Sequence, residues 1–342
     1  LATYLKANLD PALTVYFEWG NENPWNSAYG FYHSSLVISE AKAYVARGAL
    51  PNLDDPAENE WYLGARWVFM RTVNASDIFR TQFGADFDRR VVPIVASQYA
   101  NPSYVGNSAN WVLRKYPNHL SYYIKGFSFA PYIGASDGTV DQLLAKLNTD
   151  IANRQSFMNN LAKWRGVADA YKVKLFLYEA GVDVGQGVNN ITNRIALGYE
   201  PRMQSTIDAY LRSCYNTAGS ESLMWFNAIC TRDKWGIWGL TDDAVDLMQP
   251  MYKAAAQFVT QSAPGSGVMA TFYKDTNFTT VLSTHPIPLI NHYWQAWDTG
   301  PIYGRKDLST TQVQDGSIRF VGRYLGTGTL SVEKEANDIA TL

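Results

Sequence analysis

The sequence has only two cysteines and four histidines among its 342 residues. Cys214 and Cys230 can make neither a disulfide framework nor a metal site, and a predicted strand separates them, so we expect two free, buried thiols. The histidines lie far apart and show none of the spacings of metal ligands, which leaves a metal-dependent hydrolase poorly supported. We therefore expect no bound metal and no cofactor. The histidines are His33, His119, His285 and His292.

Other patterns are missing as well. No apolar run reaches the roughly 18 residues that a membrane-spanning helix needs. The formal net charge is -2 and no run of like charges occurs, which argues against nucleic acid or an anionic membrane as the main partner. A nucleotide-binding, doubly wound sheet normally has a Gly-rich phosphate loop after its first strand, and none is present.

Aromatic residues, by contrast, are abundant, with 11 Trp and 22 Tyr. Many of them fall in predicted loops, where a role in the protein core is a weaker explanation. Their flat apolar rings suit ligands with flat apolar faces, such as sugars. Burial in a large barrel remains an equally good explanation for any one of them.

Short apolar strands alternate with helices along most of the chain. Such alternation predicts an α/β fold with a parallel sheet and right-handed crossovers. We expect the last five βα units of an eight-fold (β/α)8 barrel, strands four to eight, with three earlier strands outside this sequence. The predicted strands are 15–19, 90–97, 124–132, 173–179 and 222–229, and the predicted helices are 35–47, 60–83, 111–116, 140–171, 203–215 and 244–259.

The barrel is expected to occupy residues 1–260. A linker rich in Ser, Gly and Pro follows at 261–267. Beyond it helical periodicity stops, and short alternating strands predict an all-β, sandwich-like module at 268–342. Its expected strands are 267–278, 290–297, 316–326 and 329–336.

Two predicted strands end in carboxylates. The first predicted strand in the chain, 15–19, runs into Gly20-Asn21-Glu22. The fourth predicted strand in the chain, 173–179, belongs to the segment KLFLYEAG and ends at Glu179. An α/β barrel presents its reactive groups at the C-terminal ends of its strands, so the two glutamates are expected to be partners. Two carboxyl groups at one rim are the minimum equipment for cleaving a glycosidic bond. A helix cap or a salt bridge is the alternative for each glutamate.

Gly20-Asn21-Glu22 after a strand resembles the Asn-Glu acid/base motif that closes the fourth barrel strand in clan A retaining glycoside hydrolases. Counting forward, Glu179 closes the seventh strand, where that clan carries its nucleophile. The resemblance covers roughly residues 1–260. It implies a glycosidase that cleaves a β-linked polysaccharide or oligosaccharide of the cellulose, β-glucan or hemicellulose class by double displacement.

The same resemblance assigns further roles. It implies that Asn21 binds the sugar 2-hydroxyl, that Tyr132 orients the nucleophile and that Trp225 forms the floor of the central sugar subsite. For Tyr132 a core position is an equally good reading. Trp25 is the better sugar platform beside the acid/base, and Gln98, with its neighbour Tyr99, ends a strand where it could line the cleft. Two assignments remain undecided. Glu18 is an alternative to Glu22 as the acid/base, and Trp19 fits the barrel core as well as a place beside the sugar.

The C-terminal module resembles the protective-antigen-type β-sandwich attached to many secreted glycosidases. The residues that carry this resemblance are GVMATFYKDTNF and FVGRYLGTGTLSVEKEANDIATL. It implies secretion or attachment to a cell surface, with a polysaccharide as partner. The alternative function is a non-catalytic carbohydrate-binding or adhesion protein on a barrel scaffold, because a fold does not fix a function.

Overall fold

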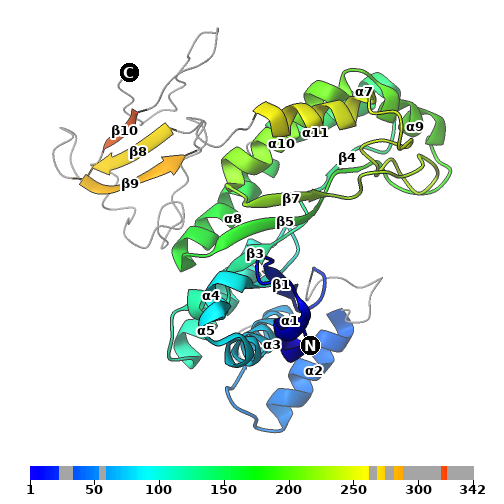
Figure 1. Ribbon diagram of the computed structural model, residues 1–342. Helices are drawn as coiled ribbons and strands as arrows, with labels where there is room; N and C mark the ends of the chain where they lie inside the picture. The colour runs from blue at the N-terminus through cyan, green and yellow to red at the C-terminus, as the bar shows by residue number, and fades with distance from the viewer. Residues whose placement is uncertain are drawn as a thin grey trace.

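The computed structural model describes residues 1–22, 34–53, 59–153, 155–261, 268–273, 281–287 and 317–321 (Figure 1). Its centre is a 5-stranded sheet in the order β1-β2-β3-β5-β7. All four strand pairs are parallel, and the order in the sheet follows the order in the chain. The α/β fold with five parallel strands is thereby confirmed. These strands are β1 (Val15–Glu18), β2 (Val91–Ala96), β3 (Gly126–Ser128), β5 (Lys174–Ala180) and β7 (Ser222–Trp225).

The sheet is curled like half of a barrel. In a flat sheet β1 and β5 would lie about 14 Å apart, three strand spacings. The rings of Tyr16 on β1 and Phe176 on β5 nevertheless meet, with centroids 5.7 Å apart. Gly126 on β3 makes this possible, because a Cβ there would lie 2.4 Å from the Phe176 ring. The concave face is open, and Tyr16 is 55% exposed.

Helices cover the convex face of the sheet. Phe17, which alternates with Tyr16, stacks on Phe79 of α3 at 4.6 Å, and the large rings Trp111 and Trp164 are fully buried. The longer helices are α1 (Ala2–Asn8), α2 (Ser34–Ala46), α3 (Glu60–Phe83), α5 (Pro102–Lys115), α7 (Val140–Ala152), α8 (Phe157–Tyr171), α9 (Ile191–Tyr199), α10 (Met203–Ala218) and α11 (Pro250–Gln261). Short turns are the 3-10 helix η1 (Gly84–Asp86), α4 (Phe87–Arg90) and α6 (Leu120–Tyr123).

Several predicted helix boundaries are wrong. Helix α5 begins at Pro102, well before the predicted 111, because proline at the first turn needs no N–H partner. The single helix predicted for 140–171 is two helices, and a capping box between Thr139 and Gln142 fixes the start of α7. Helix α9 was not predicted.

The predicted helix at 244–259 starts six residues late, at Pro250. Asp243 accepts the backbone N–H of Val245 at 2.9 Å, and Asp246 accepts that of Met248 at 3.0 Å. Side chains that satisfy the backbone in this way compete with the helix. Residues 244–249 therefore belong to the long connection after β7.

The predicted strand at 124–132 is also shorter, since β3 ends at Ser128. Pro131 has no N–H to give to a sheet, and the chain leaves the ladder before it. It then forms β4 (Ile133–Gly134), which pairs in parallel with β6 (Val182–Asp183) beyond the end of β5.

In the C-terminal region β8 (Val268–Tyr273) pairs antiparallel with β10 (Ser317–Val321) and β9 (Val281–Ile287). Strands β8 and β10 lie within the ranges 267–278 and 316–326 that were predicted as strands, whereas β9 was not predicted. The strands predicted at 290–297 and 329–336 lie outside the described residues, as does most of the expected linker. The sandwich-like module and its domain boundaries stay predictions.

Both cysteines are free, as predicted. Cys214 is buried in α10, and Cys230 is only half-buried in the connection after β7. None of the described helices is long and apolar enough to cross a membrane.

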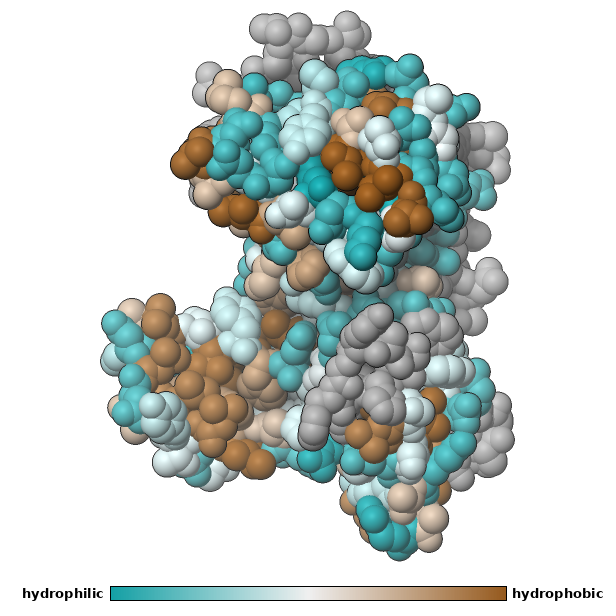
Figure 2. All heavy atoms as spheres, turned by 90° about the vertical axis from the view of Figure 1, so that its right-hand side faces the viewer, coloured by the Kyte–Doolittle hydropathy of each residue, from teal (hydrophilic) through white to brown (hydrophobic). Residues whose placement is uncertain are grey.

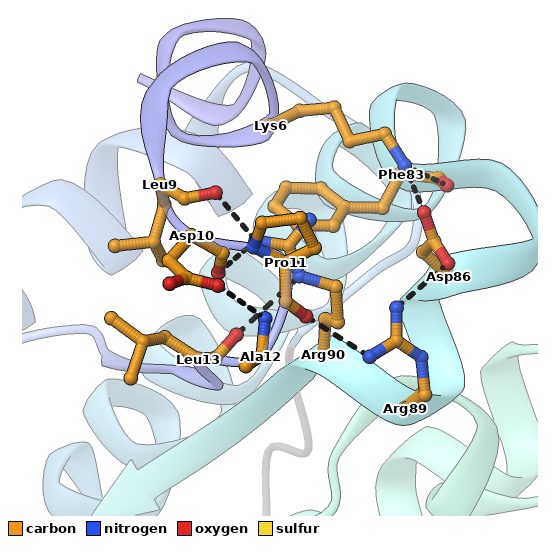
Figure 3. Close-up of polar contacts among 10 residues, drawn as sticks. All are labelled: Lys6, Leu9, Asp10, Pro11, Ala12, Leu13, Phe83, Asp86, Arg89 and Arg90. Atoms are coloured by element: carbon orange, nitrogen blue, oxygen red, sulfur yellow. Dashed lines mark hydrogen bonds and ion pairs between the residues drawn. The ribbon is translucent and has the colours of Figure 1, made fainter.

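Strand β1 is anchored at its start by a buried arginine (Figure 3). The Arg90 guanidinium, at the end of α4 and 3% exposed, donates to the carbonyls of Leu9 at 3.1 Å, Asp10 at 3.0 Å and Leu13 at 3.4 Å. The neighbouring Arg89 lies outside, where it donates to the Pro11 carbonyl at 3.0 Å. The chain entering β1 is thus tied to the end of α4.

These two arginines form a matched pair for a stability test. Arg90→Ala removes a buried side chain and its hydrogen bonds to three part-buried carbonyls, so we expect the free energy of unfolding to fall by about 2–4 kcal/mol. Arg89→Ala removes an exposed contact and should change it by less than about 1 kcal/mol. Urea unfolding followed by near-UV circular dichroism measures both. Equal losses in the two variants would contradict the anchoring role of Arg90.

Candidate functional site

The C-terminal ends of the five parallel strands lie along one edge of the sheet, because strands that run the same way finish on the same side. The side chains predicted as functional follow these ends. Glu22 follows β1, Gln98 follows β2 and Tyr132 follows β3. Glu179 and Trp225 lie at the C-terminal ends of β5 and β7.

Glu179 receives a hydrogen bond from across the rim. The Tyr132 hydroxyl donates to Glu179 Oε1 at 2.7 Å. Burial raises the pKa of Tyr132 far above its usual value, with a further contribution from the hydrogen bond to Glu179, so the phenol remains a donor at any working pH. The loop before Tyr132 is held from behind, because the buried Tyr210 hydroxyl donates to the Pro131 carbonyl at 2.8 Å. The position expected for an orienting tyrosine is therefore occupied by one.

A β-bulge near the end of β5 changes the direction in which its side chains point at this rim. Leu177 pairs with Leu223 and Ala180 pairs with Trp225, so two residues of β5, Tyr178 and Glu179, stand opposite one residue of β7. Strict alternation would send the two side chains to opposite faces of the sheet. A bulge removes that alternation, and both side chains reach the same group of carboxylates.

Glu22 sits in a turn with unusual backbone angles. Gly20 has φ of +80° and Glu22 has φ of +48°, a left-handed conformation that costs a non-glycine residue about 1–2 kcal/mol. Such conformations persist where the surroundings impose them, and they gather at functional sites. Burial raises the pKa of Glu22, the nearby Tyr178 hydroxyl lowers it, and the charge of Glu179 raises it. The charge of Glu179 therefore acts on Glu22 across the rim.

A third carboxylate lies below this pair, on the concave face. Glu18, on β1, accepts a hydrogen bond from Ser128 Oγ on β3 at 3.3 Å. The residue keeps contact with solvent in the open half-barrel, while the protein packed around its carboxyl group raises the pKa to about 6. The Ser128 hydrogen bond opposes that rise, and the charge of Glu179 adds to it. Glu18 belongs to the same cluster and lies on β1 itself, whereas Glu22 lies in the turn that follows β1.

Tyr178 is the member of the cluster that the sequence analysis missed. Its side chain interacts with all three carboxylates, Glu22 foremost, and burial raises its pKa far above the usual value. Its hydroxyl is buried and, unlike those of Ser128 and Tyr132, makes no hydrogen bond of ordinary geometry within the described part of the chain. The one signal for Tyr178 in the sequence was its position next to Glu179. In a regular strand neighbouring side chains point to opposite faces, so that position argued against a shared site.

The remaining predicted residues lie in different settings. Trp225 is half-buried, its indole N–H donates to the Trp238 carbonyl at 2.9 Å, and its ring meets Tyr210 edge-on at 6.0 Å. Gln98 is half-buried and accepts a hydrogen bond from Asn101 at 2.5 Å. Asn21 is exposed beside Glu22. Trp25 lies outside the described residues.

Two aromatic neighbours of the predicted site belong to the packing instead. Tyr99 stacks on Phe129 at 5.6 Å and donates to the Phe157 carbonyl at 2.7 Å, so it points into the core. Trp19 packs on the core with the Arg71 guanidinium 4.4 Å from its ring centroid, as the core interpretation expected. It lines a cavity of about 300 Å³ between α2 and α3.

A glycine stands two residues after Glu179. Gly181 has φ of +150°, a backbone conformation that residues with a side chain rarely adopt. A Cβ there would make only ordinary contacts, at 3.4 Å from the Trp225 ring and the Phe226 carbonyl, so the backbone angle is the reason for glycine at this position. In the part of the chain that the structure describes, no group of three or more His, Cys, Asp or Glu side chains is arranged to hold a metal ion.

Comparisons with known proteins give little beyond this. No protein-family model and no curated protein matches the chain. Among solved structures, the thermostable GH51 α-L-arabinofuranosidase from Thermotoga petrophila RKU-1 is similar, with a TM-score of 0.33 and 14% sequence identity. The match covers 82% of this chain and 50% of that one, so the chain spans about half the length of the enzyme.

The carboxylate cluster predicts a measurable titration. With a pKa of about 6, folded Glu18 binds its proton more tightly than the unfolded chain does, so its contribution to stability falls as pH rises from about 4.5 to 6. Ser128→Ala removes a hydrogen bond to the charged form and should raise this pKa further. NMR titration of labelled glutamate carboxyl carbons, assigned with Glu18→Gln, measures both effects. A Glu18 pKa near 4.5, or one that falls in Ser128→Ala, would contradict this description.

Proposed function

We propose that this protein is a retaining glycoside hydrolase in which Glu179 is the nucleophile and Glu22 the general acid and base. The observation that carries the proposal is the cluster itself. Two glutamates from different strands interact at one rim of a curled parallel sheet, and a tyrosine donates to the proposed nucleophile at 2.7 Å. Glycosidic cleavage requires such a pair.

The surroundings of each glutamate support its proposed role. A general acid must hold a proton at working pH, and burial raises the pKa of Glu22. A nucleophile must be held in position for attack, and the Tyr132 hydroxyl donates a hydrogen bond to Glu179 at 2.7 Å. The roles assigned from the resemblance thus agree with the surroundings of each residue.

The reaction proceeds in two displacements. Glu179 attacks the anomeric carbon, and the glycosidic oxygen leaves with the proton of Glu22. Glu22, now a carboxylate, takes a proton from water, and that water attacks the anomeric carbon and releases Glu179. The two inversions retain the anomeric configuration. A β-linked polysaccharide or oligosaccharide is the substrate class that the sequence resemblance implies, and secretion or surface attachment comes from the same resemblance.

The main alternative is a carbohydrate-binding or adhesion protein without catalysis. The aromatic surface near the rim would serve it equally well. A binding surface does not need a tyrosine that donates to one of two neighbouring glutamates, so this arrangement favours the hydrolase. Binding of a polysaccharide without release of reducing sugar would favour the alternative.

Variants of the two glutamates test the roles directly. On a substrate with a poor leaving group we expect Glu22→Ala to lose about 10²–10⁴-fold in rate, the usual range for general acid catalysis, and Glu179→Ala to lose turnover altogether. The substrate panel should hold aryl glycosides of both anomers. With an activated β-glycoside, azide should rescue Glu22→Ala with retained configuration and Glu179→Ala with inverted configuration.

Glu18→Gln is the matched control, because it changes a third carboxylate of the same cluster. It should keep activity within about tenfold, since Glu18 lies deeper than the proposed acid/base. Undiminished activity in either alanine variant would overturn the assignment. A loss in Glu18→Gln as large as in Glu22→Ala would transfer the acid/base role to Glu18.

Tyr178→Phe tests the environment of the acid. The Tyr178 hydroxyl lowers the pKa of Glu22, so its removal should raise that pKa and move the alkaline limb of the kcat/KM profile to higher pH. Tyr132→Phe, which removes the donor to Glu179 instead, provides the comparison. A shift to lower pH in Tyr178→Phe would show that Glu22 does not control that limb.

A further inference from the structure

Exposed aromatic side chains stand on the connection between β7 and α11. Phe226 is 43% and Trp235 57% exposed. Tryptophan is highly buried on average, so a ring exposed to this extent calls for an explanation. Figure 2 views the end of the molecule that carries α9 and shows apolar patches among polar residues on that face.

The backbone beneath Trp235 is firmly held. Asp233 and Gly236 exchange two backbone hydrogen bonds of 3.2 and 3.1 Å, and the Asp233 carboxylate accepts the N–H of Trp235 at 2.7 Å. The carbonyl of Lys234 accepts the N–H of Gly187 at 2.7 Å, which fixes the turn to the chain after β6. Trp235 is therefore presented at the tip of a rigid turn.

A continuous series of contacts links this turn to the carboxylates. The Trp238 indole N–H donates to the Trp235 carbonyl at 2.7 Å. The Trp238 ring meets Tyr132 edge-on at 5.5 Å and Phe226 edge-on at 5.7 Å. Tyr132 in turn donates to Glu179. The contacts thus run from the proposed nucleophile through the rings of Tyr132 and Trp238 to the backbone of the turn that carries Trp235.

We propose that Trp235, with Phe226, forms a stacking platform for a further sugar unit, so that the substrate is an oligosaccharide or polysaccharide chain. This inference rests on the proposed function, since it extends the same site. The C–H faces of a pyranose or furanose ring pack on indole, and an exposed, pre-positioned ring supplies that contact at low entropic cost. Continuity with the carboxylates favours a sugar chain over a protein partner.

Trp235 suits this role better than Trp225 does. The Trp225 N–H is already bonded to a backbone carbonyl, and its ring packs against the buried Tyr210. Trp235 is 57% exposed, and because the Lys234 ammonium lies over its ring, 5.0 Å from the centroid, a sugar would stack on the opposite face. The platform of the outer subsite is thus a residue that strand position alone does not indicate.

The kinetic test compares a chain with a single sugar unit. The polymers are mixed-linkage β-glucan, xylan and linear arabinan, and the small substrates are the matching aryl monosaccharide glycosides. We expect Trp235→Ala to raise KM on the polymer about threefold to tenfold, the range of one aromatic contact, and to leave the aryl glycoside within about twofold. Trp235→Phe should keep most of the affinity. Met248→Ala, 69% exposed on the same connection, is the control and should match the wild type.

A binding test separates this inference from the proposed function. Affinity electrophoresis of the full chain in gels containing the same polymers, with Glu179→Gln as background, should show retardation that Trp235→Ala abolishes. If the wild type binds a polymer and hydrolyses nothing, while Trp235→Ala loses binding, the proposed hydrolase function is wrong and the sugar-stacking role of Trp235 is supported. Hydrolysis with unchanged KM and retardation in Trp235→Ala would overturn the platform alone. Equal losses on both substrate sizes, or in Met248→Ala, would also overturn it.

Discussion

The curl of the five-stranded sheet is the constraint on which the candidate site depends. Glu22 and Glu179 follow strands that two others separate, and in a flat sheet their side chains would not interact. Contact between Tyr16 and Phe176 across the concave face shows how far the sheet bends. Gly126 leaves the space for that contact, since any Cβ there would collide with Phe176. A residue with no side chain, remote from the rim, thus allows the carboxylates to meet.

Within the cluster, hydroxyl groups separate the roles of similar carboxylates. Ser128 donates to Glu18, Tyr132 donates to Glu179, and Tyr178 lies beside Glu22. For Glu18 and Glu22 the hydroxyl lowers the pKa, while burial and the charge of Glu179 raise it. The strained backbone of Glu22 and the bulge before Ala180 are local irregularities at this rim. Both occur where the proposed chemistry needs side chains that regular strands would not deliver.

Much of this arrangement could be predicted from the sequence. The alternation of apolar strands with helices predicted the parallel sheet, because parallel strands need crossover connections that helices supply. Glu22 and Glu179 could be found because a polar residue at the end of an apolar strand stands out. The pairing of Tyr132 with Glu179 was expected from the resemblance, and the two residues are indeed hydrogen-bonded.

The rest depends on contacts that local pattern does not encode. Tyr178 reaches the cluster only through a bulge, and no rule of alternation predicts one. Tyr99 ends a strand as cleft residues do, yet tertiary packing turns its ring onto Phe129. The exposure of Trp235 is known only from the structure. The helix that starts at Pro102 was predicted to start too late. The one that starts at Pro250 was predicted to start too early, because hydrogen bonds from side chains to the backbone, as at Asp243, leave no trace in apolar periodicity.

The central claim is that Glu179 forms a covalent bond to the sugar. A 2-deoxy-2-fluoro glycoside of the hydrolysed sugar, with an activated leaving group, traps such an intermediate because fluorine slows its breakdown. Proteolysis and mass spectrometry of the trapped protein then locate the bond. The account predicts one added glycosyl group on the peptide that contains Glu179. A label on Glu22 or Glu18, or an active enzyme that takes up no label, would contradict it.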